Sequence, residues 1–310
     1  MNYRSVFITT VQTVGFFASG FIIPLLGQIL ALFTPVPLMI AYVRNGRLEG
    51  LTALMAATVI VALLGGWQFG ALLLFSFGLM AVGTAEGMRR QLKPERIALL
   101  GGMLPIITLG AGLTLYFTHI GKNPLIVVEE YLREGMAEAA TVYTRFGLAE
   151  MAATVTSISD TFVHYLVRLL PSITIATSVA QAAICYGIAR SVIMRRPSAD
   201  TSTIQSSLAL WHAPDAWVWG LIVALTLLVM PNEIAKLMGW NLAILYATLY
   251  LAQGIAVVDH YLRKTRMRPV IRGMIHTFIL TLPSIVFVIA LGIVDIWADF
   301  RKARQRVQKA

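Results

Sequence analysis

The sequence predicts an all-α fold, a polytopic transmembrane helical bundle, and three observations support this prediction. The chain of 310 residues is 57% hydrophobic and only 13% charged, about half the charged fraction of an ordinary soluble domain. Its mean hydropathy is +0.75. Apolar runs long enough to cross a bilayer alternate with short basic loops. We therefore expect a single membrane domain, residues 1–310, with about eight or nine spans.

The net charge of +10 is concentrated in loops that adjoin the apolar runs. This distribution is typical of the cytoplasmic loops of a multi-pass membrane protein. The basic loops lack the interleaved aromatic residues of single-strand binders, so we expect the lipid bilayer as a partner and no nucleic acid. Four segments hold 17 of the 25 basic residues, namely Arg89 to Arg96, Arg190 to Arg196, Arg263 to Arg272 and Arg301 to Lys309.

The first elements are predicted from run length and proline positions. Val6–Phe33 is too long an apolar run for the core of a signal peptide, which favours an uncleaved first span. Pro35 and Pro37 precede only about nine apolar residues, too few for a straight helix to cross a bilayer. We expect Thr34–Val43 to be a short or broken span inside the bundle, because irregular backbone is not tolerated against lipid.

A hairpin and a further span follow. Leu51–Leu64 and Phe69–Val82 are separated by Gly65-Gly66-Trp67-Gln68, a turn sequence with a tryptophan suited to the outer interface. Glu86 lies just before a basic segment, and we expect it to pair with those arginines. Ile97–Phe117 predicts the next span.

Residues 120–162 form an amphiphilic region, which predicts an external insertion of two helices. Apolar residues recur at three- and four-residue spacing from Val128 to Phe146, and a second stripe follows Gly147. Between Ile120 and His164 there are six acidic and three basic residues. The positive-inside rule therefore places this helical hairpin outside, on the membrane or over the bundle.

The remaining third of the chain adds spans on either side of basic loops. We expect Val163–Ala189 to re-enter the membrane, residues 190–215 to form a cytoplasmic linker loop, and residues 216–300 to supply extra C-terminal spans. A single last span over Gly273–Trp297 would put the basic tail outside, against the charge rule. Either Pro283 breaks this run into a re-entrant hairpin or the span count differs by one; we favour an internal tail.

Side chains that could carry chemistry are sparse, which predicts that the protein is not an enzyme and has no cofactor. The five histidines are scattered without a metal-binding spacing. Cys185 is the only cysteine, which excludes an intrachain disulfide and a multi-cysteine metal site. Asp295 and Asp299 are four residues apart, so we expect them to share a helix face as an electrostatic end-cap. No catalytic and no metal-binding residue is predicted.

The end of the chain resembles a known family. Asn241, Tyr250–Val258 and Leu291–Arg301 look like the closing pattern of the bacterial YybS-like membrane proteins, whose function is unknown, and Pro35–Gly50 and Arg168–Pro171 also resemble that family. The family is distantly similar to the S components of energy-coupling-factor vitamin transporters and to the cell-shape protein MreD. The resemblance implies structural roles for Asn241, Gln253, Gly254, Asp295, Trp297, Asp299, Phe300 and Arg301.

The S-component resemblance implies six core helices with a short second one, and a ligand near the outer face. We therefore expect a transporter-like subunit that binds a small solute; a membrane protein or an energising module is the candidate partner. Arg168 is a candidate contact as an arginine inside a span, although it could instead snorkel or pair with Glu150 or Asp160. The full set of candidate substrate-binding residues is Arg168, His164, Trp67, Gln68 and Tyr116.

The alternative function is a membrane scaffold or assembly protein of the cell envelope without a ligand, as the MreD resemblance implies. A polar cavity among the five candidate residues would support solute binding. A solid bundle with an exposed face of small residues would support the scaffold.

Overall fold

The computed structural model describes residues 2–195, 213–265 and 284–300, together with residues 267, 271 and 275. Within these ranges every regular element is a helix, which confirms the predicted all-α membrane class. Seven of the described helical stretches are long and apolar enough to cross a membrane. Two shorter apolar helices accompany them, α10 (Val218–Val229) and α13 (Ser284–Ala298).

The other helices fall into an amino-terminal set and a later set along the chain. The amino-terminal set comprises α1 (Tyr3–Ile22), α2 (Leu26–Ala31), α3 (Pro35–Asn45), α4 (Arg47–Gly65), α5 (Trp67–Leu72), the π-helical turn η1 (Leu73–Gly78), α6 (Leu79–Arg89) and α7 (Pro94–His119). The later set comprises α8 (Pro124–Arg145), α9 (Ala149–Met194), the 3-10 turn η4 (Asp215–Trp217) and α11 (Glu233–Lys264).

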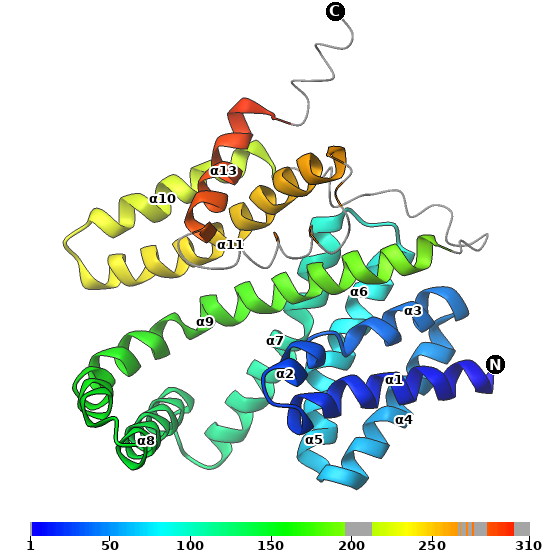
Figure 1. Ribbon diagram of the computed structural model, residues 1–310, viewed down its shortest axis with the longest axis horizontal. Coiled ribbons are helices and arrows are strands. Elements are labelled where there is room, and N and C mark those ends of the chain that lie inside the picture. The colour runs from blue at the N-terminus through cyan, green and yellow to red at the C-terminus, as the bar shows by residue number, and fades with distance from the viewer. Residues whose placement is uncertain are drawn as a thin grey trace, which may run out of the picture.

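One apolar core joins the helices α1, α3, α4, α6, α7 and α9. Met39, Leu73 and Tyr186 are fully buried in it. Eight of the eleven residues of α3 are buried, so the short element that begins at Pro35 lies inside the bundle, as predicted. In Figure 1, α9 runs between this bundle and the group formed by α10, α11 and α13, and α9 packs against both α7 and α11.

The predicted first span, Val6–Phe33, is not one helix. It ends at Ile22 because Pro24 has no N–H with which to continue the helical hydrogen bonds. Leu25 then takes a positive φ of 59°, and α2 packs back against α1. The prediction of one continuous span was therefore wrong, because a single proline ends the helix within an otherwise apolar run.

Side chains bond two carbonyl groups around this break. The hydroxyl of Ser19 lies 3.1 Å from the carbonyl oxygen of Gly27 and 2.7 Å from that of Phe16 in its own helix, and its proton is shared between them. The carbonyl oxygen of Leu32 accepts from Nε2 of Gln181 at 2.9 Å and from Sγ of Cys185 at 3.4 Å. The two contacts of Leu32 connect the segment after α2 to α9, and such contacts satisfy carbonyl groups that lipid cannot.

Two glycines turn the chain where the sequence predicted hairpins. Gly66 has φ +103° between α4 and α5, which pack against each other. Gly147 has φ +75° between α8 and α9, and these two helices also pack together. Such values favour glycine because it has no Cβ. The helix that follows Gly147 continues without interruption through Pro171 to Met194, so the second amphipathic stripe and the re-entering span form one helix. That the hairpin lies outside stays a prediction.

The last helices form a second packed group. The helix α11 contacts α9, α10 and α13, and Figure 1 shows α13 crossing α11. At this crossing a Cβ on Gly254 would lie 2.0 Å from the carbonyl oxygen of Val288, and one on Gly292 would lie 2.0 Å from that of Tyr250. The two backbones approach so closely only because both positions are glycine. The predicted linker at 190–215, the break at Pro283 and the tail from Arg301 lie largely or wholly outside the described residues.

Replacement of Gly254 by alanine is expected to lower the melting temperature of the detergent-solubilised protein, because the added methyl group would collide with backbone. Gly112→Ala is the matched control: its Cβ would meet nothing within 4 Å, and removing glycine from a helix interior stabilises by about 0.5–1 kcal/mol. Thermal unfolding of both variants measures the difference. A Gly254→Ala protein that melts at or above the wild type would contradict this packing of α13 on α11.

Candidate functional site

The five residues predicted to bind a solute are all exposed. Trp67 and Gln68 begin α5, Tyr116 lies near the end of α7, and His164 and Arg168 lie in α9. In the described part of the chain, no hydrogen bond, ion pair or ring contact joins any two of them. The rings of Tyr116 and His164 contact only their chain neighbours among the ring pairs found, Phe117 and Tyr165. The five residues line none of the three hollows that the structure describes, so their role in binding stays a prediction.

A hollow of about 510 Å³ lies instead in the groove between α8 and α9. Its walls are mostly small residues, and three of its threonines donate their hydroxyl protons to carbonyl groups of their own helix at 2.9–3.0 Å. Their oxygen atoms therefore face the groove as hydrogen-bond acceptors. The lining residues are Met136, Ala137, Ala140, Thr141, Thr144, Ala149, Ala152, Ala153, Thr156 and Ser159.

Sequence reasoning missed this groove although a signal was present. Alanine and threonine recur at three- and four-residue spacing in the sets Ala137, Ala140, Thr141, Thr144 and Ala149, Ala152, Ala153, Thr156. Small residues on facing sides of two helices leave space between them. Alanine and threonine add little to hydrophobic periodicity, so this pattern does not show in the apolar stripes.

Acidic and aromatic side chains adjoin the groove. A second hollow of about 280 Å³ shares Met136 with it and is lined in part by Tyr131, Glu134, Glu138 and Phe162. Nearby, the guanidinium group of Arg133 pairs with Glu129 at 2.9 Å and with Asp160 of α9. Asp160 therefore forms an ion pair with Arg133, whereas the sequence suggested Asp160 as a partner of Arg168.

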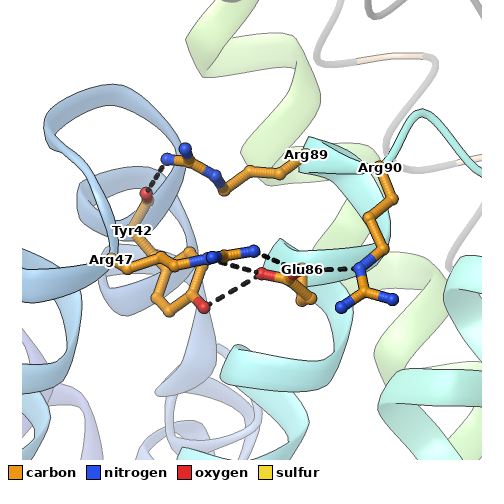
Figure 2. A network of polar contacts seen from close by, with 5 residues as sticks. All are labelled: Tyr42, Arg47, Glu86, Arg89 and Arg90. Atoms are coloured by element: carbon orange, nitrogen blue, oxygen red, sulfur yellow. Dashed lines mark hydrogen bonds and ion pairs between the residues drawn. The ribbon is translucent and has the colours of Figure 1, made fainter.

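A charged cluster surrounds the carboxylate of Glu86 (Figure 2). Oε1 of Glu86 accepts from Arg47 at 2.5 Å and from Arg90 at 2.8 Å. Oε2 accepts from Arg47 at 3.1 Å and from the hydroxyl of Tyr42 at 3.1 Å. The carbonyl oxygen of Tyr42 in turn accepts from Arg89 at 3.4 Å. One carboxylate therefore links α3, α4 and α6, and the cluster retains net positive charge.

A polar centre is buried where α11 meets α13. Nε2 of Gln253 donates to Oδ2 of Asp295 at 3.1 Å, and Oε1 of Gln253 accepts from the backbone N–H of Ala213 at 3.2 Å. Both side chains are fully buried. Oδ1 of Asp295 accepts from the backbone N–H of Phe300 at 3.1 Å, just beyond the end of α13. This arrangement holds the end of α13 and the segment before α10 on α11.

The other residues of the C-terminal pattern lie along α11 and at or just beyond the end of α13. Asn241 donates to the carbonyl oxygen of Arg168 in α9 at 3.2 Å, and the carbonyl oxygen of Phe300 accepts from the hydroxyl of Tyr261 at 3.2 Å. Trp297 is exposed, and Arg301 lies outside the described residues. Asp299 follows the end of α13 with φ 44°. Asp295 and Asp299 therefore do not share a helix face, because the helix ends at Ala298.

Nearly all of these features lie within the residues that match a known protein family. The model of the family described as "Predicted membrane protein (DUF2232)" matches residues 11–296. The chain belongs to this family. No curated protein and no solved structure matches it. The region shared with DUF2232 includes the apolar core, the hairpin of α8 and α9, and the contact between Gln253 and Asp295.

Gln253→Leu is expected to destabilise the protein by about 1–3 kcal/mol, because it leaves buried polar groups of Asp295 and Ala213 without that partner. The control is Thr248→Val in the same helix, since the hydroxyl of Thr248 donates to Ile244 of its own helix. Thermal or denaturant unfolding in detergent provides the measurement. Equal stability of the two variants would argue against the polar centre.

Glu86→Gln is expected to lower the melting temperature by about 2–4 °C and to remove most of its salt dependence. The wild-type pairs involve exposed arginines, and salt screens such pairs. Melting curves at low salt and at about 1 M salt test this for the wild type, Glu86→Gln and the exposed control Glu130→Gln. The same salt dependence in all three proteins would speak against a stabilising cluster.

Proposed function

We propose that the protein is a non-enzymatic component of the bacterial inner membrane that docks a partner protein in the groove between α8 and α9. The partner chemistry that fits is a helix with a basic face. The observation that carries this proposal is the small-residue groove, on a hairpin whose first helix contains no buried residue.

The shape of the groove supports a helix as its occupant. Ala137, Ala140 and Ala153 have side chains of one carbon, so the backbone of a third helix can approach closely. An amphipathic helix commonly binds in a groove between two helices through residues at helical spacing. The hairpin also projects away from the core in Figure 1, which leaves room for a partner beside it.

The charge of the hairpin supports a basic partner. Residues 120 to 164 carry six acidic and three basic residues, and Glu134 and Glu138 are exposed beside the groove. Complementary charge speeds association and disfavours wrong partners more than it adds affinity. The resemblance to MreD, an envelope assembly protein, agrees with this function.

A second candidate function is that of a transporter-like subunit binding a small solute. The hollow of about 510 Å³ lies within the range of about 300–1,000 Å³ common for ligand pockets. Its threonine oxygens could accept hydrogen bonds from an amine or polyol. Six helices share the core and the second element is short, which agrees with the S-component resemblance. On this function an energising module would be the partner.

Site-specific cross-linking in intact membranes tests the docking function. With Cys185 replaced by alanine, a cysteine introduced at the exposed position Thr144 should form one discrete adduct with a neighbouring protein. Ala140→Trp should abolish this adduct by filling the groove, and Glu134→Lys with Glu138→Lys should reduce it several-fold. Glu233→Lys is the charge control at the start of α11 and should leave the adduct intact.

The outcomes separate the two functions. An adduct that survives Ala140→Trp and the paired charge reversals would refute docking in this groove. Absence of any adduct, together with a solute that raises the melting temperature of the wild type but not of Ala140→Trp, would favour the transporter-like subunit.

A further inference from the structure

The second hollow, of about 280 Å³, opens on the opposite side of α8 from the groove proposed for docking. Ala137 lines the groove and Gly135 lines this hollow. Two residues along a helix correspond to about 200° around its axis, because one turn takes 3.6 residues. Met136 lies between them and lines both. The hollow is therefore a separate site, and a ligand in it leaves the groove open.

Aromatic rings from both helices of the hairpin form walls of this hollow. Tyr131 of α8 and Phe162 of α9 line it, and both are exposed. Leu132, Met136 and Val163 add apolar surface. The face of an aromatic ring carries partial negative charge and attracts a cation, and ammonium groups in particular are recognised by such rings. The walls therefore suit a ligand that is cationic and partly apolar.

Two carboxylates line the same hollow and have no cation of their own. Glu134 and Glu138 are exposed there, and neither carboxylate forms a hydrogen bond or an ion pair with any residue in the described part of the chain. Four residues apart on one helix, they repel each other. The nearby Arg133 is already paired with Glu129 and Asp160. The hollow thus presents negative charge that a bound cation would balance.

Exposed apolar side chains surround the hollow on the same face of the hairpin. Their spacing places them within about 60° of one another around each helix. They are Tyr131, Val142 and Phe146 of α8, and Ile158, Phe162 and Tyr165 of α9. The helix α9 runs on from Tyr165 to Met194 as a candidate membrane span. This apolar face is therefore continuous with the lipid-facing surface of that span.

The position of the hollow along the hairpin favours a lipid as its ligand. Val163, which lines the hollow, is the residue at which the sequence predicts that the chain re-enters the membrane. On the other helix, Tyr131 lies only about 10 Å along α8 from Pro124, and α8 begins shortly after α7 ends at His119. On that prediction, both walls of the hollow lie at the level of the lipid headgroups.

We infer that this hollow binds the ammonium headgroup of an aminophospholipid, the chemistry of phosphatidylethanolamine. The ammonium group donates charge-assisted hydrogen bonds to Glu134 and Glu138 and lies against the rings of Tyr131 and Phe162. The acyl chains lie along the exposed apolar face. A soluble amine offers the same charge but no acyl chain for that face. This site does not depend on the proposed docking function.

Native mass spectrometry of the full-length protein in detergent tests the inference. Phosphatidylethanolamine should bind in saturable fashion, and phosphatidylglycerol with the same acyl chains should bind several-fold more weakly. Glu134→Gln with Glu138→Gln should weaken the binding of phosphatidylethanolamine several-fold, because both negative charges are lost. Glu150→Gln removes another exposed carboxylate of the hairpin and should bind like the wild type. Free ethanolamine at millimolar concentration, measured by its effect on the melting temperature, forms the second arm.

The rings are tested separately from the charges. Tyr131→Leu with Phe162→Leu keeps the wall apolar but removes both ring faces, and it should also weaken the binding of phosphatidylethanolamine several-fold. Tyr131→Phe keeps the ring and should bind like the wild type, which guards against a loss caused by misfolding. The leucine variant should still form the cross-linked adduct at Thr144, because the groove is intact.

Each remaining outcome would contradict part of the inference. Equal binding of phosphatidylglycerol and phosphatidylethanolamine would overturn recognition of the ammonium group. Unchanged binding by both double variants would overturn the site. Stabilisation by free ethanolamine without any binding of phosphatidylethanolamine would overturn the lipid as the source of the cation.

Discussion

Lipid offers no hydrogen bond to the backbone, and much of this bundle follows from that constraint. Around the break between α1 and α3, Ser19 donates to the carbonyl group of Gly27, and Gln181 and Cys185 donate to that of Leu32. The hydroxyl of Ser178 likewise donates to the carbonyl oxygen of Gly102 at 2.8 Å. Several polar side chains inside the bundle are therefore there because a broken or closely packed backbone requires them.

The same solvent makes close packing the main attraction between helices, since lipid tails are as apolar as the side chains they would replace. Gly254 and Gly292 let α11 and α13 approach until backbone atoms meet. That approach also brings Gln253 next to Asp295, and the buried hydrogen bond between them is possible only at this separation. Packing and polar contact thus stabilise one arrangement of the last helices.

The sequence predicted features that depend on local chemistry. Pro35 and Pro37 indicated a short buried element, and Gly65-Gly66 indicated a turn; both are present. The pairing of Glu86 was predicted for the adjacent arginines and holds for Arg90. Its contacts with Tyr42 and Arg47 were missed, because residues about forty positions apart come together only through packing of α3, α4 and α6. From run length alone, the sequence also predicted one span where the structure has α1 and α2. It predicted two separate elements where the structure has the single helix α9.

The groove between α8 and α9 favours a helix over a small solute for a geometric reason. Pockets for small molecules commonly bury about 70–90% of the ligand surface, whereas Thr141, Thr144 and Thr156 are themselves exposed. A solute bonded to these hydroxyls would remain largely in water and would gain little from leaving it. A docked helix would cover the groove, bury its alanine walls and bring a basic face to Glu134 and Glu138. The exposure of the lining residues therefore favours a protein partner.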